Sequence, residues 1–448
     1  MNPIRTIKII SVIRAYLPAH SKRVIIWCQF AYIVCFLTYI GATLAGAQNS
    51  LPLIKPVPKP VQLGPFVTHL IDVDTLILAP DARKTFRVDG SPYSAAILDT
   101  GLRTSHQDFS GRVIDKSNFT TDNNNNSNDV ADGNGHGTNV AGIIAANKIH
   151  TGIAPGARLV PLKVLKNDGS GTFDGVDKAL QWVEKNFIKD KITVVSLSLG
   201  DNGNYINDSA FPSDNIHARI QELKKLNIPV VIAAGNGWFA NNSMAGVTAQ
   251  EGMSYPAIFP EAVSVGAVFD SEVKTPVAWT DGSIAYIQDP DQITPFSQRL
   301  HDSGTGYETD VFAPGSHVVS SGIDSDVGES VQDGTSQACP IITGVILLVQ
   351  QYYSRITSSG STLGVLPTVD QIKKWLRLGS VDIVDQCPAV SQACDNVIHT
   401  RKTYRRINVV KVLQAVTQDV QNQVLAEGVP TSQLKDVVKA RAVQSEIR

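Results

Sequence analysis

Five short apolar runs, separated by amphipathic stretches, constrain the fold of this chain more than any other feature. Each run is almost continuously apolar, which is typical of strands in a parallel sheet that is covered on both faces. The runs are YSAAILD (93–99), RLVPLKVL (158–165), ITVVSLSL (192–199), IPVVIAA (228–234) and AVSVGAV (262–268).

Helical patterns lie between and after these runs. Apolar residues recur at i, i+3, i+4 and i+7 in segment 175–186, and segment 215–227 has a similar pattern. Segment 341–353 is apolar along most of its length and predicts a central, buried helix. The alternation predicts an α/β fold: a doubly wound, mostly parallel sheet with helices on both faces. In such sheets, ligands bind beyond the carboxyl ends of the strands.

The N-terminal region predicts export. Basic residues precede the first acidic one, Asp72, and an apolar run over 24–47 ends in Ala45-Gly46-Ala47. This pattern predicts a signal peptide over 1–47 that is cleaved before Gln48. The run is also long enough to span a bilayer, so an uncleaved signal anchor is the alternative. Either one predicts a secreted or extracytoplasmic chain, including a periplasmic or membrane-anchored one.

The rest of the chain divides into three parts. Segment 48–85 begins with a proline-rich stretch and is predicted to be a linker or a short pro-segment. Segment 86–418 is predicted to form one large domain, and 419–448 a polar C-terminal tail. Lys plus Arg number 39 and Asp plus Glu 41, so the charge balance gives no support for a nucleic-acid partner.

Of the five cysteines, Cys28 and Cys35 lie in the predicted signal. Cys387 and Cys394 bracket a short loop, and they form either a disulfide in an oxidising compartment or two unrelated thiols. Cys339 lies three residues after Ser336, so two nucleophile types occur in one short stretch, DGTSQACPI.

Asp99, His136 and Ser336 lie in glycine-rich loops at the expected edge of the sheet. Taken singly, each has a structural explanation: a turn residue, a helix start and an N-cap. Taken together, they supply what serine catalysis requires. An imidazole removes the hydroxyl proton, and a carboxylate fixes the tautomer of the imidazole. Their separations along the chain are 37 (136 − 99) and 200 (336 − 136) residues.

The segments AILDTGLRTSHQDF, DGNGHGTNVAG and DGTSQACPIITG resemble the three signature blocks of the subtilisin-like serine proteases, the subtilases. The chain order Asp, His, Ser is also the subtilisin order. Further similar blocks follow in the family order, and the resemblance covers roughly residues 93 to 416, with the proteinase K-like branch nearest. These blocks are LVPLKVLKNDGSGTF, VVSLSLG, VVIAAGN, SYPAIFPEAVSVGAV, DVFAPGSHVVSS and RRINVVKVLQA.

The resemblance implies a serine endopeptidase that acts through an acyl-enzyme. It implies that Asp99 orients His136, that His136 is the general base and then the acid, and that Ser336 is the nucleophile. Asn236 and the backbone N–H of Ser336 would donate to the oxyanion. The thiol of Cys339 is then expected to be a small buried packing residue, one helical turn away from the site.

The resemblance also implies a substrate cleft, in which an extended peptide pairs with the backbone of two segments. Small residues on the pocket walls predict broad specificity, with an apolar-leaning pocket for the residue before the scissile bond. A selective processing protease and a catalytically inactive binding protein are the alternatives. The residues implied to bind substrate are Gly169, Ser170, Gly171, Ser198, Leu199, Gly200, Ala234 and Gly235.

The expected partners are polypeptide substrates, with no nucleic acid, a monomeric chain, and membrane contact only through an uncleaved N-terminus. The chemistry itself requires no cofactor. Segment 120–132 is predicted to be a solvated Asn-rich loop. It also offers alternating oxygen ligands of the kind that calcium takes, so a structural calcium site is the alternative, and no metal ligand is assigned.

Several positions depart from the family pattern. Gln337 replaces a frequent Met, and Asn139 replaces a frequent His. Pro340 is expected in the first turn of a helix that starts near Ser336, where backbone N–H groups have no helical partner.

Overall fold

The structure, a computed structural model, describes residues 70–201, 203–243, 248–357, 365–387 and 393–426. These residues all belong to the second of the chain's two structural units, Pro52–Arg448. The predicted signal over 1–47 and most of the predicted linker lie outside the described residues. Within the described part, no helix has both the length and the apolar character that a membrane span requires.

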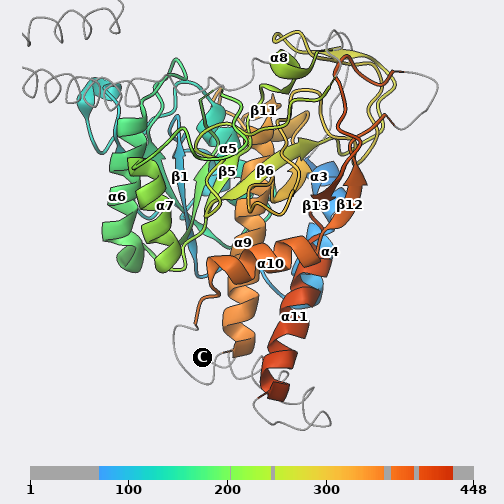
Figure 1. The fold of residues 1–448 in the computed structure, drawn as a ribbon. Helices are drawn as coiled ribbons and strands as arrows, with labels where there is room; N and C mark the ends of the chain where they lie inside the picture. The colour runs from blue at the N-terminus through green and yellow to red at the C-terminus, as the bar shows by residue number, and fades with distance from the viewer. Residues whose placement is uncertain (1–69, 202, 244–247, 358–364, 388–392, 427–448) are drawn as a thin grey trace, which may run out of the picture. The chain divides into compact units, whose positions relative to one another are not determined.

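A nine-stranded sheet organises the described residues, in the order β12-β13-β9-β6-β5-β4-β1-β3-β2 (Figure 1). All neighbouring strands pair in parallel except β12 and β13, which are antiparallel. The predicted mostly parallel sheet is therefore confirmed. Its strands are β1 (Ser94–Asp99), β2 (Ser117–Asn118), β3 (Arg158–Lys163), β4 (Ile192–Leu197), β5 (Val230–Ala233), β6 (Val263–Val268), β9 (Val311–Pro314), β12 (Val381–Val384) and β13 (Thr403–Arg406).

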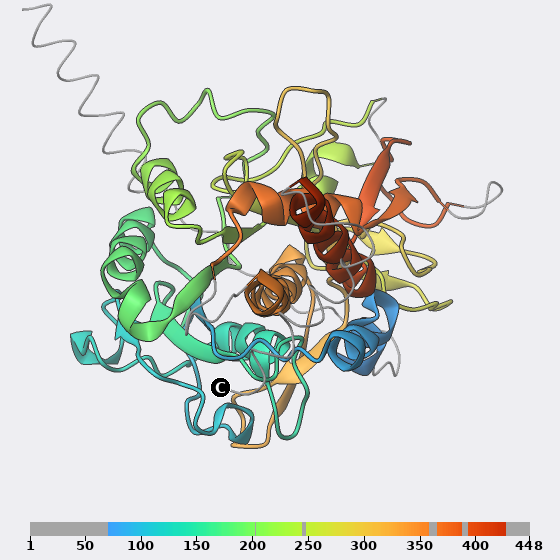
Figure 2. The same cartoon turned by 90° about the horizontal axis from the view of Figure 1, so that it is seen from below.

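Helices cover both faces of this sheet, which explains the continuous apolar runs. Every residue of β1, β4, β5 and β6 is buried, so neither face of these strands contacts water. On one face, α5 (His136–Ala145), α9 (Thr335–Thr357) and α11 (Val409–Ala426) contribute to one apolar cluster. On the other face, α6 (Phe173–Asp190) and α7 (Asn215–Lys225) contribute to a second. Figure 2 shows α9 end-on, with α5, α6, α10 (Val369–Leu378) and α11 around it.

The strand order also fixes where a ligand can bind. After β1 the chain forms β2 and β3 on one side of β1, and it later returns to place β4 on the other side. This reversal is the topological switch point at which doubly wound sheets bind ligands. Asp99 ends β1, and residues 198–200 directly follow β4, so both lie at that edge.

Pro340 lies inside α9 rather than in its first turn, because the helix begins at Thr335. Our sequence-based reason for its tolerance was therefore wrong. A proline lacks the N–H that would bond to the carbonyl four residues earlier, which here belongs to Ser336. The Ser198 hydroxyl donates to this carbonyl oxygen at 2.7 Å. A side chain from the end of β4 thus replaces the missing helical hydrogen bond, immediately beside the predicted nucleophile.

The folded unit extends beyond both predicted domain boundaries. Before residue 86, α3 (Leu70–Ile77) and α4 (Ala79–Phe86) bury Val73, Ile77 and Ala82 in the α9 cluster. After residue 418, α11 continues to Ala426 and keeps Val420 and Val424 buried. Apolar residues four positions apart form one helical face in each segment, and the polar residues between them hide this pattern from a composition-based reading.

The remaining short elements are peripheral to the sheet. They are η1 (Gln107–Phe109), η2 (Asn123–Asn125), α8 (Trp238–Asn242), β7 (Val277–Ala278), β8 (Ile284–Ala285), β10 (Val318–Ser321) and β11 (Glu329–Gln332). Cys387 and Cys394 form a disulfide, which decides between the two alternatives for this pair. Among the described cysteines, Cys339 is the free one.

The Asn-rich segment 120–132 uses many of its polar groups internally. Asn123 donates to the carbonyl oxygens of Asp129 and Ala131, and the Asp122 carboxylate accepts from the Asn167 N–H at 2.6 Å. The ammonium of Lys163 lies 3.7 Å from the same carboxylate. These contacts belong to the Asn-rich loop that the sequence favours, and a calcium site there stays unassigned.

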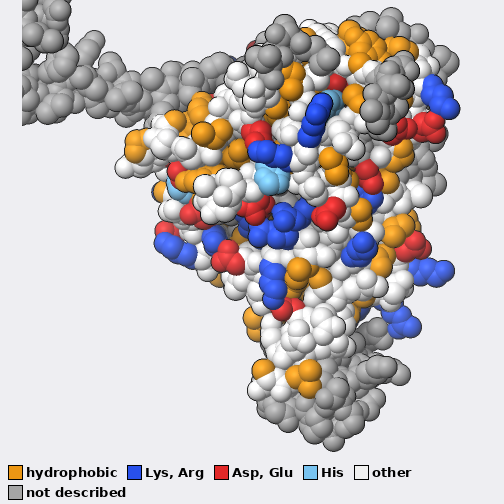
Figure 3. Space-filling model, turned by 45° about the vertical axis from the view of Figure 1, so that its right-hand side comes forward, with side chains coloured by type: hydrophobic (Ala, Val, Ile, Leu, Met, Phe, Trp, Pro, Cys, Tyr) orange, Lys and Arg blue, Asp and Glu red, His pale blue; other side chains and the backbone are white. Residues whose placement is uncertain are grey.

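The surface carries charges of both signs. On the face drawn in Figure 3, Lys and Arg side chains are interspersed with Asp and Glu rather than gathered in one basic field. This distribution matches the near balance of 39 basic and 41 acidic residues in the whole sequence. The predicted absence of a nucleic-acid partner stays a prediction.

Candidate active site

Asp99 and His136 are in direct contact at the carboxyl edge of the sheet. Asp99 is the last residue of β1, and its Oδ1 lies 2.7 Å from His136 Nδ1. The same oxygen accepts the N–H of Thr100 at 2.7 Å. Both side chains are at most 2% exposed, so the pair is shielded from water and from salt. The carboxylate therefore fixes the imidazole orientation and places the Nδ1 proton between the two groups.

His136 is the first residue of α5, and its neighbours hold it there. Gly135 has a φ of +98°, a conformation that favours glycine, and its carbonyl oxygen accepts from Gln332 Nε2 at 3.2 Å. The N–H of Gly137 donates to the Thr100 hydroxyl at 2.8 Å. The residues before and after His136 are therefore both fixed by hydrogen bonds of their backbone groups to neighbouring segments.

The opposite ring nitrogen, His136 Nε2, is buried and has no hydrogen-bond partner among the described residues. Burial disfavours the imidazolium, but the charge and the hydrogen bond of Asp99 outweigh it. The net effect raises the pKa of His136 above its ordinary value. An unpartnered imidazole nitrogen with raised basicity is suited to accept a proton from a hydroxyl.

Ser336 is the second residue of α9, and its hydroxyl donates to the Ser198 carbonyl oxygen at 3.3 Å. It makes no hydrogen bond to His136, so the predicted nucleophile–base contact is open in this structure. Rotation about the Cα–Cβ bond of Ser336 moves the hydroxyl between partners, and such contacts often tighten only when substrate binds. The first turns of α5 and α9 are adjacent, because Gln337 Nε2 lies 3.4 Å from Asn139 Oδ1.

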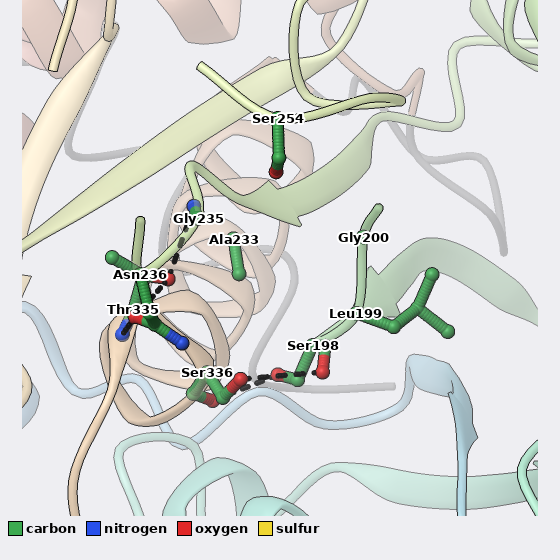
Figure 4. A pocket seen from close by; sticks show the side chains of 9 residues that line it. All are labelled: Ser198, Leu199, Gly200, Ala233, Gly235, Asn236, Ser254, Thr335 and Ser336. Atoms are coloured by element: carbon green, nitrogen blue, oxygen red, sulfur yellow. Dashed lines mark hydrogen bonds between the residues drawn. The ribbon is translucent and has the colours of Figure 1, made fainter. Parts of the chain in front are cut away.

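Asn236 follows β5 and lies at the start of α9. Its Oδ1 accepts both the N–H and the hydroxyl of Thr335, at 2.9 and 3.0 Å. These two bonds orient the amide so that its Nδ2 points away from Thr335, toward the side on which Ser336 lies (Figure 4). Nδ2 and the positive end of α9 are therefore available to one anionic atom beside Ser336.

A small open pocket adjoins these groups (Figure 4). It spans about 220 Å³ when the open solvent at its mouth is included, so it is a shallow depression beside Ser336. Its lining is formed by Ser198, Leu199, Gly200, Ala233, Gly235, Asn236, Ser254, Thr335 and Ser336.

The pocket includes residues that the sequence analysis missed. Ala233, Ser254 and Thr335 line it, whereas the predicted Ala234 does not. The sequence signal for Ser254 was the block SYPAIFPEAVSVGAV, of which Ser254 is the first residue. Its N–H donates to the Ala234 carbonyl at 2.8 Å, and this hydrogen bond holds Ser254 at the pocket.

The predicted substrate segment at 169–171 lies outside this pocket. Gly169 has a φ of +80°, and the Lys166 N–H bonds to the Ser170 carbonyl at 2.7 Å, so these residues form a tight turn. Gly171 pairs with Leu165 in an isolated antiparallel bridge. Their pairing with a bound peptide stays a prediction.

Cys339 is fully buried under the sheet, which confirms its expected packing role. Its Sγ lies 3.4 Å from the Val231 carbonyl oxygen and 3.7 Å from that of Leu197. Burial raises the pKa of this thiol to about 12, so it stays protonated at neutral pH. The thiolate is the reactive form of cysteine, and this thiol is therefore a poor nucleophile.

Comparison with known proteins identifies relatives of this arrangement. The family profile described as the subtilase family matches residues 90–377, which include all the residues above. The major intracellular serine protease of Bacillus subtilis (strain 168) is 30% identical over 308 residues, covering 65% of this chain and 81% of that protein. The extracellular serine proteinase of Thermus sp. (strain Rt41A) is 30% identical over 296 residues, covering 66% and 60%.

A solved structure of a cold adapted subtilisin-like serine proteinase is 25% identical to this chain. The alignment covers 72% of this chain and 90% of the solved one, with a TM-score of 0.49. The similar proteins thus include both an intracellular and an extracellular enzyme.

Proposed function

Because the chain belongs to the subtilase family and is a subtilisin-like serine peptidase, we propose that Asp99, His136 and Ser336 form its catalytic triad. One observation carries this proposal: the buried 2.7 Å contact between Asp99 and His136, with the opposite ring nitrogen left without a partner. Because the Asp99 carboxylate binds Nδ1 and orients the ring, Nε2 is the nitrogen that acts as the base.

The proposed reaction begins when the Ser336 hydroxyl turns from the Ser198 carbonyl to His136 Nε2. His136 takes the proton while Ser336 Oγ forms a bond to the carbonyl carbon of the substrate. The negative charge on the carbonyl oxygen is held by Asn236 Nδ2 and the Ser336 N–H. His136 then gives its proton to the leaving amine, and the C–N bond breaks. Water, activated by the same imidazole, hydrolyses the acyl-enzyme and restores Ser336.

The pocket supports a preference for uncharged, small to medium side chains before the scissile bond. Its walls are backbone and small side chains, with Leu199 as its largest apolar group. The hydroxyl of Ser254 is already bonded to the Ala234 carbonyl at 3.1 Å. Among the described residues, no carboxylate lines the pocket, so they offer no counter-charge to a basic side chain. This composition favours broad digestion of polypeptides over a selective processing protease that cleaves after basic residues.

The remaining proposals concern place and assembly. We propose an exported, monomeric enzyme whose signal lies in segment 1–47, outside the described residues. A binding protein without activity is disfavoured because Asp99, His136, Asn236 and Ser336 all occupy their expected edge of the sheet.

Hydrolysis of casein and of a peptide library by the wild type, Ser336→Ala and Cys339→Ser tests the function. We expect at least a 10³-fold loss in Ser336→Ala, because removal of one triad member leaves only the oxyanion and binding contributions. Cys339→Ser should retain activity if it folds. Substantial activity in Ser336→Ala would exclude the proposed nucleophile. A folded, inactive Cys339→Ser would instead implicate the thiol.

The same library tests specificity. The expected profile has Ala, Leu or similar residues before the cleaved bond. A strict requirement for Lys or Arg would support the processing protease and contradict the proposed pocket preference.

A further inference from the structure

A second cluster of reactive side chains lies outside the candidate active site, in the loop that precedes β13. It consists of the disulfide pair, Cys387 and Cys394, with Asp395 and His399. One donor atom from each residue lies within 4.8 Å of all the others. Cys394 and Asp395 are buried, whereas Cys387 and His399 are partly exposed, so solvent reaches one side of the cluster. The proposed proteolytic function uses none of these groups.

The spacing of the donor atoms corresponds to a tetrahedral metal site. Bonds of about 2.3 Å to sulfur and about 2.0–2.1 Å to nitrogen or oxygen place neighbouring ligand atoms about 3.3–3.8 Å apart. His399 Nε2 lies 3.6 Å from Cys387 Sγ and 3.8 Å from Cys394 Sγ. Asp395 lies 3.7 Å from Cys394 Sγ through Oδ2, and 3.2 Å from His399 Nε2 through Oδ1. With Asp395 Oδ2 as the ligand atom, three ligand–ligand edges are therefore close to tetrahedral length: His399–Cys387, His399–Cys394 and Asp395–Cys394. The sulfur–sulfur edge is closed by the disulfide.

The histidine is also held as metal-binding histidines are. Its other nitrogen, Nδ1, lies 2.8 Å from Asp385 Oδ1, so Nε2 faces the sulfurs. Asp385 is itself fixed, because its Oδ2 accepts the Thr400 N–H at 2.7 Å and lies 3.3 Å from Arg299 Nε. A carboxylate that accepts from the distal nitrogen is the usual outer partner of a zinc-bound histidine.

We propose that the reduced chain binds one thiophilic divalent cation, of the zinc type, through Cys387, Cys394, His399 Nε2 and one Asp395 oxygen. The disulfide is the oxidised, metal-free state of the same site. An external dithiol supplies the two electrons that break the S–S bond and becomes a cyclic disulfide itself. The two resulting thiols release two protons to solvent when the cation binds as its dithiolate complex. For this, the sulfurs separate to about 3.8 Å.

The location gives this exchange a structural consequence. The indole N–H of Trp238 donates to the Ile398 carbonyl at 3.1 Å, and the Ile398 N–H donates to the Asn242 carbonyl at 2.8 Å. Both contacts attach the loop to α8, which starts two residues after Asn236. A disulfide or a cation can each join Cys387 to Cys394 close to this attachment, whereas free thiols leave the two residues unconnected.

Cobalt titration of the full chain tests the proposal. The chain carries Ser336→Ala to prevent self-digestion, and Cys28→Ser with Cys35→Ser so that only Cys339, Cys387 and Cys394 remain. Ser336→Ala also makes the test independent of the proposed function. After reduction with an immobilised dithiol, we expect one Co²⁺ per chain, a sulfur-to-cobalt charge-transfer band and the visible bands of tetrahedral cobalt. Zn²⁺ should displace them.

Variants assign the ligands. Cys387→Ser and Cys394→Ser should each diminish the charge-transfer band, and His399→Gln should weaken Co²⁺ binding. Asp385→Asn should weaken binding by about 10–100-fold, since it removes only the outer partner of the histidine. Asp382→Asn, a matched change at an exposed position of β12, should leave the affinity unchanged. The oxidised chain should bind no cobalt.

A second measurement uses the chain with all four ligands intact, so its result does not depend on whether the ligand variants fold. In the reduced parent, Zn²⁺ should protect Cys387 and Cys394 from alkylation by iodoacetamide, as read by peptide mass spectrometry. Three results would overturn the proposal: a reduced chain that binds no more Co²⁺ than the oxidised one, binding without a sulfur band, or a disulfide that no dithiol reduces while the chain stays folded.

Discussion

Asn139 and Gln337, two departures from the subtilase pattern, contact each other in the fold. Gln337 Nε2 lies 3.4 Å from Asn139 Oδ1 and 3.3 Å from Gln332 Oε1. Asn139 Nδ2 in turn donates to the carbonyl and hydroxyl of Ser330, at 3.0 and 2.9 Å. Both side chains are fully buried, and Gln337 Nε2 is the partner that the described residues supply to Asn139 Oδ1. The two substitutions therefore form one polar bridge between α5 and α9.

A double-mutant cycle tests this bridge. In the Ser336→Ala chain, Gln337→Met and Asn139→Ala should each lower the free energy of unfolding by about 1–3 kcal/mol. Gln337→Met leaves the buried Asn139 Oδ1 unpaired, and Asn139→Ala removes one partner of Gln337 Nε2 and both hydrogen bonds to Ser330. The double variant should lose less unfolding free energy than the two single variants combined. The difference, a coupling of about 0.5–3 kcal/mol, is measured by urea unfolding. In the control cycle, Gln337→Met is combined with Asp382→Ala, and the two changes in unfolding free energy should add. Additivity in the Asn139 cycle would contradict the bridge.

Asn236 offers a test of transition-state stabilisation. Asn236→Leu removes the Nδ2 donor, and we expect kcat to fall by about 10²–10³-fold with little change in KM, because the bond forms only to the developing oxyanion. Steady-state kinetics on a chromogenic peptide measure both constants. An unchanged kcat, or a loss confined to KM, would remove Asn236 from this role.

Much of the candidate site could be predicted at this scale, because short motifs fix the residue types that the chemistry requires. Asp99, His136, Asn236 and Ser336 lie at the predicted sheet edge. The position of Ser254 could not be predicted, because it depends on a loop that packs against Ala234. The Ser198 hydroxyl was also missed as the partner of the Ser336 carbonyl, since that contact depends on where Pro340 lies within α9.

At the scale of secondary-structure elements, Gly137 allows α5 to pack closely against the loop after β1. A Cβ on Gly137 would lie 2.3 Å from the Gly101 carbonyl oxygen and 3.2 Å from the Asp99 Cβ. The first contact is with backbone, which has little freedom to retreat. The close approach of the two segments, and with it the Asp99–His136 bond, therefore requires glycine at this position.

Gly137→Ala should lower kcat/KM by about 10²-fold, because a displacement of about 1 Å is enough to cost that much in alignment. Gly175→Ala in α6 is the matched control. A Cβ there meets no atom closer than 3.5 Å, so this variant should keep full activity and gain up to about 1 kcal/mol in stability. Equal activity in the two variants would show that α5 tolerates the displacement.

Element positions were predictable where one pattern dominated the sequence. The five apolar runs became β1, β3, β4, β5 and β6, because burial on both faces favours apolar residues at almost every position. The helices α3, α4 and α11 were missed or cut short. Their stability comes from one narrow apolar face against α9, and that face is recognisable only when its partner is known.

At the scale of the whole domain, buried ion pairs connect segments that are distant in sequence. His150 Nδ1 lies 2.7 Å from Asp108 Oδ2, and its Nε2 lies 3.1 Å from Glu329 Oε1. Asp108 also accepts the Ser321 hydroxyl at 2.7 Å, and His106 Nδ1 lies 3.5 Å away. Burial opposes charge on both members, but their mutual contact prevails. The pKa of His150 is raised and that of Asp108 is lowered.

These opposite shifts predict how stability depends on pH. A raised histidine pKa stabilises the fold below its unfolded value of about 6.5, and this contribution is lost as pH rises through the folded pKa. Urea unfolding of the Ser336→Ala chain, with and without His150→Gln, should therefore show a difference in unfolding free energy that is largest near pH 6. This difference in unfolding free energy should decrease as pH rises above 6.5. A constant or widening difference would contradict the pairing.

The central claim is that one serine of this domain, activated by His136, forms the covalent intermediate. Labelling of the native enzyme with a fluorophosphonate, followed by peptide mass spectrometry, tests it most directly. We predict one adduct per chain, on Ser336, and a loss of labelling of at least about 10³-fold in His136→Ala. An adduct on Cys339 or on another residue, or undiminished labelling of Ser336 without His136, would contradict the account.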